Sequence, residues 1–430
     1  MMTIDMLCRV VDNYGDIGVV YRLARALSEL DEAPRLRLVV DDLSAFSLLE
    51  PGIDPGRAVQ SVRGWTVLSW ALTGPESAAA RNAAYEDDPA LVVLECFACG
   101  RPDWLEAMLF DPSDAVARTI VNLEYLTAEP YADEFHRMPS LTRSRKVRKY
   151  MFLPGFTAAT GGLILDGAFM RSLDRFSRAE SAGADRRELL ARAVHASCRK
   201  LADAAAVDAA AADPASLPAT EDRIWALVFG YERDYGRMVD DLAMFAQDRP
   251  VLALVAGGKS QPCFMAAWER AGRPFPALAL PFLDQETWDA ILAASDFLVV
   301  RGEDSMSRAA LAGKPFLWQA YPQDGAHQLV KVKALLDRMK PHFTAEAFRP
   351  VEAAFLAVND RLRDSPLTCG SERVLPLLEA AAASGRAAAG RTAARGTARG
   401  TAEGFASFAK SLSGNGNLAL NLMTYLREIV

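Results

Sequence analysis

A strand, a charged turn and a short helix are predicted in succession over residues 296–318, and this succession is the strongest constraint on the fold. Residues 297–300 read Phe-Leu-Val-Val, a short apolar run that is typical of a buried strand. Residues 306–312 have a helical pattern, with Gly313 as its C-terminal cap and Pro315 as its stop. A second strand is expected from residue 316.

The turn between strand and helix reads Arg301-Gly302-Glu303-Asp304-Ser305. Amides at a helix N-terminus and an arginine side chain both bind anions, so the turn predicts a site for a phosphorylated ligand. The alternative is a surface turn in which an Arg–Asp pair and a serine cap serve stability alone. The preceding strand favours a site, because ligands of open α/β sheets bind at the carboxyl ends of strands.

The same alternation of strand and helix recurs in both halves of the chain. Strands are expected over residues 6–11, 36–40, 65–70, 91–94 and 119–123, and again over 224–229, 251–255 and 277–281. Such alternation predicts the α/β class, with mostly parallel sheets covered on both faces. Acidic residues follow several of the expected strands, namely Asp12, Asp16, Asp41, Glu95 and Glu124.

A length of 430 residues allows two or three domains. We expect an N-terminal Rossmann-like domain, an Ala-rich linker with helices, a C-terminal Rossmann-like domain, a low-complexity insertion and a C-terminal helix. These five segments are residues 1–175, 176–222, 223–379, 380–404 and 405–430.

Composition excludes several classes of function. A net charge of −7 does not indicate general nucleic-acid binding. No apolar run approaches the ~20 residues of a membrane helix, and the start lacks the pattern of a signal peptide, so we expect a cytoplasmic protein. Cys96 and Cys99 form a lone C-x-x-C that we interpret as buried structural thiols. His136 and His327 lack metal-ligand spacing, so a metal-independent site is expected.

Two carboxylates, Asp12 and Asp16, flank the turn Asn13-Tyr14-Gly15 after the first expected strand. The turn has the position of a Rossmann phosphate loop, but two carboxylates would repel a pyrophosphate. One aspartate alone fits an N-cap and an Asx turn. Two on one short turn also fit a bound cation or basic group, and the residues leave both interpretations open.

Aromatic residues also follow the second series of strands. Phe282 and Trp288 could enclose a base whose polar edge Gln285 contacts, but both aromatics also fit a core. Tyr231 and Tyr321 each follow a strand, and each alone fits a packed aromatic at a sheet edge. The basic run at residues 143–149 fits a solvated face, or a patch for an acidic partner or an anionic membrane.

Together these motifs resemble the EarP family, which are protein-arginine rhamnosyltransferases of translation elongation factor P. The resemblance rests on motifs that occur in family order over residues 4–335. They are C-R-V-V-D-N-Y-G-D-I-G-V at residues 8–19, N-L-E-Y-L at 122–126, F-L-P-G-F-T at 152–157, R-G-E-D-S at 301–305, A-G-K-P-F at 312–316 and Y-P-Q at 321–323. The Ala-rich segment near 180–220 and the tract near 380–404 depart from the pattern without touching a motif.

The resemblance implies a GT-B fold, with two Rossmann-like domains facing a cleft. It implies that the domain at residues 1–175 binds the acceptor protein, that the domain at 223–379 binds the nucleotide sugar, and that the helix at 405–430 returns to the first domain. It implies inverting transfer of rhamnose from dTDP-β-L-rhamnose to an arginine of elongation factor P, which activates the factor, with no cofactor, no nucleic-acid partner and no membrane partner. Asp12 and Asp16 match two essential aspartates of the family, with Asn13, Tyr14 and Gly15 on the acceptor side.

The resemblance also implies which residues bind the donor. Phe282 and Trp288 would enclose the thymine and Gln285 would contact it. The remaining residues would hold the nucleotide, diphosphate and sugar; they are Tyr231, Arg301, Glu303, Asp304, Ser305 and Tyr321. Two alternatives stay open: a GT-B glycosyltransferase with a lipid or polysaccharide acceptor, and a non-catalytic protein that binds the elongation factor.

Overall fold

The computed structural model describes residues 2–11, 15–71, 75–86, 88–177, 182–201, 223–258, 260–323, 326–359, 373–384 and 396–430. Contacts divide the chain into two compact units. Unit 1 is Met1–Gly167 with Leu412–Val430, and unit 2 is Ala168–Ser411. These borders differ from the domain boundaries expected above, which stay predictions.

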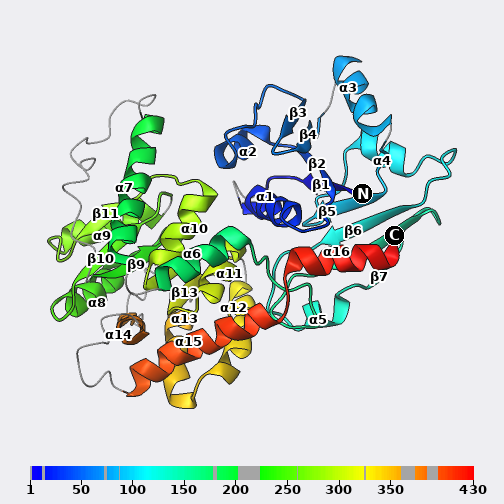
Figure 1. The fold of residues 1–430 in the computed structure, drawn as a ribbon. Coiled ribbons are helices and arrows are strands. Elements are labelled where there is room, and N and C mark those ends of the chain that lie inside the picture. The colour runs from blue at the N-terminus through cyan, green and yellow to red at the C-terminus, as the bar shows by residue number, and fades with distance from the viewer. Residues whose placement is uncertain are drawn as a thin grey trace. The chain divides into compact units, whose positions relative to one another are not determined.

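Unit 1 is built on a largely parallel sheet (Figure 1). Its strands are β1 (Thr3–Cys8), β2 (Arg35–Val40), β3 (Val59–Val62), β4 (Trp65–Ser69), β5 (Val92–Cys96), β6 (Arg118–Leu123), β7 (Pro139–Ser140) and β8 (Val147–Phe152). Their order is β3-β4-β2-β1-β5-β6-β8-β7, and the described pairs are parallel except β3 with β4 and β7 with β8. The carboxyl ends of β1, β5 and β6 therefore lie side by side.

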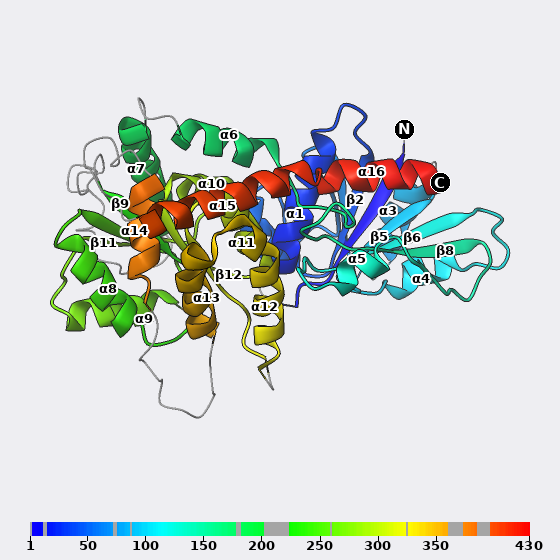
Figure 2. The ribbon, with the colours of Figure 1, turned by 90° about the horizontal axis from the view of Figure 1, so that it is seen from below.

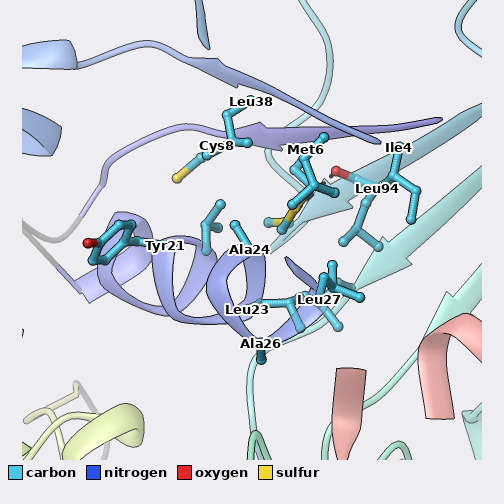
Figure 3. Packing of buried hydrophobic residues seen from close by; sticks show 14 of the residues in the cluster. Ile4, Met6, Cys8, Tyr21, Leu23, Ala24, Ala26, Leu27, Leu38 and Leu94 are labelled. Atoms are coloured by element: carbon cyan, nitrogen blue, oxygen red, sulfur yellow. Dashed lines mark hydrogen bonds between the residues drawn. The ribbon is translucent and has the colours of Figure 1, made fainter. Parts of the chain in front are cut away.

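The helices of unit 1 complete the alternating pattern. They are α1 (Gly15–Ser28), α2 (Leu43–Leu49), α3 (Pro75–Glu86), α4 (Asp103–Leu109), α5 (Tyr131–Phe135) and α16 (Leu418–Ile429). Met6 and Cys8 of β1 pack against the α1 face that carries Leu23 and Leu27 (Figure 3). The side chain of Asn417 accepts a hydrogen bond from the Ala419 amide and so caps α16, which contributes to the same core.

Unit 2 is built on a smaller parallel sheet. Its strands are β9 (Ile224–Val228), β10 (Val251–Val255), β11 (Ala277–Ala279), β12 (Phe297–Arg301) and β13 (Phe316–Gln319). Their order is β11-β10-β9-β12-β13. The first strand in sequence lies between β10 and β12, which is the reversal of strand order that marks ligand sites in such sheets.

The helices of unit 2 surround this sheet. They are α6 (Gly167–Ser177), α7 (Ala182–Leu201), α8 (Gly236–Ala246), α9 (Ser260–Arg270), α10 (Gln285–Ala294), α11 (Glu303–Ala312), α12 (Gln328–Met339), α13 (Ala345–Asn359), α14 (Leu375–Ser384) and α15 (Gly396–Gly414), with a 3-10 turn at Lys340–His342. Figure 2 shows α15 running beside α13 and α14. None of the helices in the described ranges is long and apolar enough to cross a membrane.

Several boundaries correct the sequence analysis. The tract at 380–404 is helical at both ends, where α14 and α15 extend into it. Its centre lies outside the described residues, and its interpretation as a low-complexity insertion stays a prediction. The first strand is Thr3–Cys8 instead of 6–11. Glu95 lies inside β5 instead of after it. Part of the basic run forms β8, where it pairs with β6.

Candidate functional site

Arg301, at the carboxyl end of β12, is the centre of an aromatic cluster in unit 2. Its guanidinium carbon lies 4.7 Å from the ring centroid of Phe229 and 4.9 Å from that of Tyr231. The Tyr231 ring meets Tyr321 edge-on at 5.6 Å, and Phe229 meets Trp288 edge-on at 4.9 Å. We call these five residues the Arg301 cluster. The structure thus brings together four predicted site residues around Phe229, which the sequence analysis did not select.

Adjacency of strands explains this convergence. The carboxyl ends of β9, β12 and β13 are neighbours, so Phe229, Arg301 and Tyr321 reach one edge of the sheet. A cation against aromatic rings is attracted by the negative faces of the rings. The cluster therefore offers a fixed positive charge beside flat apolar surfaces, which suits a nucleoside diphosphate.

The backbone of Tyr231 is fixed by two buried side chains. Its amide donates to Gln319 Oε1 at 2.7 Å, and its carbonyl accepts the Tyr235 hydroxyl at 2.9 Å. A Cβ atom on Gly230 would lie 2.4 Å from the Tyr235 hydroxyl oxygen and 2.6 Å from Gln319 Oε1. Only glycine fits there. Gln319 was missed by the sequence analysis, and its position directly before Ala320-Tyr321 at a strand end is the signal that was available.

The start of α11 follows Arg301. Gly302 has φ 69° and ψ 158°, a conformation that is essentially confined to glycine, and it is the N-cap residue. The first helical bond runs from the Met306 amide to the Gly302 carbonyl at 3.2 Å, so the preceding amides of the first turn point out of the helix. Asp304 and Ser305 lie in this first turn of α11, so the helix begins at Glu303, three residues before the start expected from the sequence.

Glu303 lies in the same turn, and its Oε1 is 3.6 Å from Lys331 Nζ of α12. This ion pair offsets the negative charge of Glu303. Anion binding by the turn stays a prediction.

The start of α10 carries the other predicted residues. Asp284 caps the helix, because its side chain accepts the Thr287 amide at 2.9 Å. Gln285 is buried in the first turn, and Phe282 before the cap is 43% exposed. The exposed Phe282 does not fit the core alternative, whereas Trp288 packs on Phe229 and is half-buried. Stacking of either ring on a base stays a prediction.

In unit 1 the predicted acidic turn is described in part. Asp12, Asn13 and Tyr14 lie outside the described residues, while Gly15 begins α1 and is exposed. Asp16 is 3% exposed in the first turn of α1, where a carboxylate complements the helix dipole. Its position inside the helix excludes the N-cap role that the sequence had left open for it.

Two donors hold the Asp16 carboxylate. The Val11 amide donates to Oδ2 at 2.9 Å, and the Tyr125 hydroxyl donates to Oδ1 at 2.8 Å. Tyr125 follows β6 and stacks on Phe97, with ring centroids 4.3 Å apart and 13° between the rings. Neither aromatic was selected from the sequence, although Tyr125 belongs to the motif N-L-E-Y-L that carried the resemblance.

The other acidic residues at this sheet edge have structural partners. Asp41 Oδ1 accepts the Val10 amide at 2.8 Å. Glu95 is buried and accepts from Arg101 and from Lys149 Nζ, the latter at 2.6 Å. The Asn122 side-chain amide donates to Glu124.

Several basic side chains of the run at 143–149 form ion pairs or hydrogen bonds within unit 1. Lys149 pairs with Glu95, and Arg143 Nη2 lies 2.8 Å from Glu106. Arg148 donates to the Ile429 carbonyl at 2.5 Å. These contacts favour a structural role over the membrane patch considered from the sequence.

The three cysteine thiols at the carboxyl ends of β1 and β5 are weakly acidic, and therefore poor nucleophiles at neutral pH. Cys8 and Cys96 are buried and Cys99 is partly exposed; all three are free. Burial raises the pKa of Cys8 and Cys96 and raises the pKa of Cys99 to about 12. The prediction of buried thiols is confirmed for Cys96. Within the described ranges, no group of three His, Cys, Asp or Glu side chains is arranged to hold a metal ion.

Comparisons with known proteins agree with this geometry. The family model "Elongation-Factor P (EF-P) rhamnosyltransferase EarP" matches residues 4–427. A protein-arginine rhamnosyltransferase of Pseudomonas putida is 34% identical over 368 residues, which cover 83% of this chain and 85% of that protein. One of Shewanella oneidensis is 32% identical over 348 residues, covering 77% and 79% respectively.

One solved structure supports the fold. This structure is described as "Structural basis for EarP-mediated arginine glycosylation of translation elongation factor EF-P". Its chain is 21% identical to this one in sequence, superposes with a TM-score of 0.54, and the match covers 100% of both chains. The predicted GT-B class, with two Rossmann-like units, is confirmed.

Proposed function

Because the chain belongs to the EarP family and is a protein-arginine rhamnosyltransferase, we propose that it transfers rhamnose from dTDP-β-L-rhamnose to an arginine of translation elongation factor P and so activates the factor. The transfer inverts the anomeric centre and needs no metal or cofactor. The observation that carries the proposal is the buried Asp16 carboxylate, held by the Val11 amide and the Tyr125 hydroxyl. The acceptor is a translation factor, so we expect the reaction to occur in the cytoplasm.

The acceptor requires a carboxylate. An arginine side chain is a poor nucleophile because its pKa lies above ~12 and it stays protonated. A carboxylate can hold the guanidinium, orient one nitrogen and accept its proton as the new bond forms. We assign the base role to Asp16, which is the described member of the pair, and the holding role to Asp12. Gly15, Asn13 and Tyr14 belong to the acceptor side.

The donor would bind to the carboxyl edge of the sheet in unit 2. Phe282 and Trp288 would enclose the thymine, and Gln285 would contact its polar edge. The Arg301 cluster supports this assignment, because its guanidinium lies against Tyr231 beside Tyr321. The residues proposed for the nucleotide, the diphosphate and the sugar are Tyr231, Arg301, Glu303, Asp304, Ser305 and Tyr321.

The reaction is then a single displacement. The guanidinium nitrogen attacks the anomeric carbon, the bond from that carbon to the diphosphate oxygen breaks, and Asp16 accepts the proton lost by nitrogen. The departing dTDP gains negative charge, which Arg301 and the first-turn amides of α11 stabilise. Attack opposite to the leaving group converts the β-linked donor into an α-rhamnosyl-arginine.

Mass spectrometry tests the proposal. The purified chain is incubated with elongation factor P and dTDP-β-L-rhamnose, with and without EDTA, and the acceptor is digested and sequenced. We expect one deoxyhexose on an arginine in both samples. Binding of the factor without any mass increase would favour the non-catalytic alternative. Loss of transfer in EDTA that added Mg²⁺ restores would contradict a metal-independent reaction.

A further inference from the structure

We propose that Tyr125 is a further acceptor-site residue, whose hydroxyl positions the Asp16 carboxylate and whose ring is the surface on which the arginine guanidinium lies. This inference rests on the proposed function, since it concerns the same acceptor arginine. It assigns to Tyr125 two separable tasks, one for each part of the side chain.

The hydroxyl task follows from the hydrogen bonds of Asp16. The Tyr125 hydroxyl donates to its Oδ1 at 2.8 Å, and the Val11 amide donates to its Oδ2 at 2.9 Å. Because these donors come from different segments of unit 1, they fix both the tilt and the rotation of the carboxylate.

The ring task follows from the packing of Tyr125. One face of its ring lies on Phe97 in a stack with 13° between the planes. The side chain nevertheless remains 42% exposed, beside a carboxylate that is almost fully buried. The exposed part of Tyr125 therefore belongs to a side chain that directly contacts Asp16.

The backbone beneath the stack is specialised. Phe97 has φ 61° and Ala98 has φ 50°, so two successive non-glycine residues adopt the left-handed conformation directly after β5. Bulky residues rarely adopt this conformation, and it is retained where the surrounding structure requires it. Here it holds the Phe97 ring under Tyr125.

The ligand chemistry follows from these two features. A guanidinium is planar, stacks on aromatic faces and pairs side-on with carboxylates, whereas the ammonium of lysine is a compact and strongly hydrated charge. A flat tyrosine ring next to a fixed carboxylate therefore favours arginine over lysine. The structure thus assigns part of the acceptor specificity to Tyr125.

Two variants separate the tasks. Tyr125→Phe keeps the ring and removes the hydroxyl, so we expect kcat to fall at least tenfold while KM for the acceptor protein changes less than threefold. Tyr125→Leu removes both, so we expect the same loss of kcat and a KM at least tenfold higher. Tyr150→Phe in β8 is the matched control, since it removes a tyrosine hydroxyl elsewhere in unit 1, and we expect wild-type kinetics.

The measurement is steady-state transfer of rhamnose to elongation factor P at saturating dTDP-rhamnose, together with dTDP affinity and the thermal midpoint of each variant. Unchanged kcat in Tyr125→Phe overturns the hydroxyl task, and equal KM values in both Tyr125 variants overturn the ring task. A general loss of dTDP affinity would indicate misfolding and would also overturn the assignment. Absence of transfer in the wild type refutes the proposed function itself, which is a distinct outcome.

Discussion

Replacing Gly230 by alanine should weaken donor binding, because the position has no room for a side chain. The added Cβ would lie 2.4 Å from the Tyr235 hydroxyl oxygen and 2.6 Å from Gln319 Oε1. These atoms make the two hydrogen bonds that fix the backbone of Tyr231, at 2.9 and 2.7 Å. The substitution therefore disturbs the hydrogen bonds that hold Tyr231 in the Arg301 cluster, and it changes no residue that is proposed to contact the donor.

The cost follows from packing and hydrogen bonding. Tyr235 and Gln319 are 1% and 2% exposed, so neither can move away without disturbing packed neighbours. Overpacking of this kind costs about 1–3 kcal/mol. Each buried hydrogen bond left unmade costs about 1–3 kcal/mol more. With partial relaxation of one of the two side chains, we expect a total loss of about 3 kcal/mol in the free energy of unfolding.

Part of this cost should appear in the affinity for dTDP. The Tyr231 ring lies 4.9 Å from the Arg301 guanidinium carbon, so a displaced Tyr231 changes where that charge is held. We expect dTDP binding to weaken at least about tenfold, which corresponds to about 1.4 kcal/mol. Isothermal titration calorimetry with dTDP measures the affinity, and urea unfolding measures the stability.

Gly396→Ala is the matched control in the same unit. Its Cβ would meet no atom within 4 Å, and the position begins α15. Because alanine is the better helix former, we expect stability within about 1 kcal/mol of the wild type, on the favourable side. Wild-type dTDP affinity and an unchanged urea midpoint in Gly230→Ala would refute the packing argument.

Three further predictions concern the two units. Asp16→Asn should keep the affinity for dTDP within about twofold of the wild type and lower the rate of transfer by about 10²-fold or more. Arg301→Ala should chiefly weaken dTDP binding. Equal losses of dTDP affinity in both variants, measured by calorimetry, would contradict separate roles for the two residues. Asp284→Ala removes the cap of α10 and should cost about 1 kcal/mol in urea unfolding, so an unchanged midpoint counts against the cap. Burial lowers the pKa of His136 from 6.5 to about 4, so between these values the unfolded chain binds more protons and stability should fall as the pH falls. His136→Gln should flatten that part of the stability–pH curve, and an identical curve would contradict the assignment.

The fold was predictable because parallel strands are buried on both faces and appear as short apolar runs. Residues 251–255 form a strand with the bounds predicted from the sequence. The missed strand β8 reads Val-Arg-Lys-Tyr-Met-Phe, and its basic start resembled a solvated face. What made it a strand is pairing with β6 and the ion pair of Lys149 with Glu95, which are contacts over a long sequence distance.

The candidate site was predictable only where its residues lie at the ends of strands that the sequence itself reveals. Residues at strand ends, such as Arg301 and Tyr231, were selected because the apolar runs of the strands are visible in the sequence, and their roles stay predictions. Tyr125 and Gln319 were missed because their roles depend on partners that strand order brings near, Asp16 from α1 and the Tyr231 amide after β9. Periodicity does not encode strand order, so these roles required the structure.

The acidic residues after Gly302 show how one helix start can serve both stability and anion binding. Carboxylates in a first turn stabilise a helix through its dipole, yet they compete with a phosphate for the same amides. Glu303 lies 3.6 Å from Lys331, a partner on α12, so its charge is offset to the side of the turn. Arg301 meanwhile lies against Phe229 and Tyr231. Glu303 and Arg301 thus have separate partners, and anion binding by the sequence Arg-Gly-Glu-Asp-Ser, in which two of the five residues are acidic, stays a prediction.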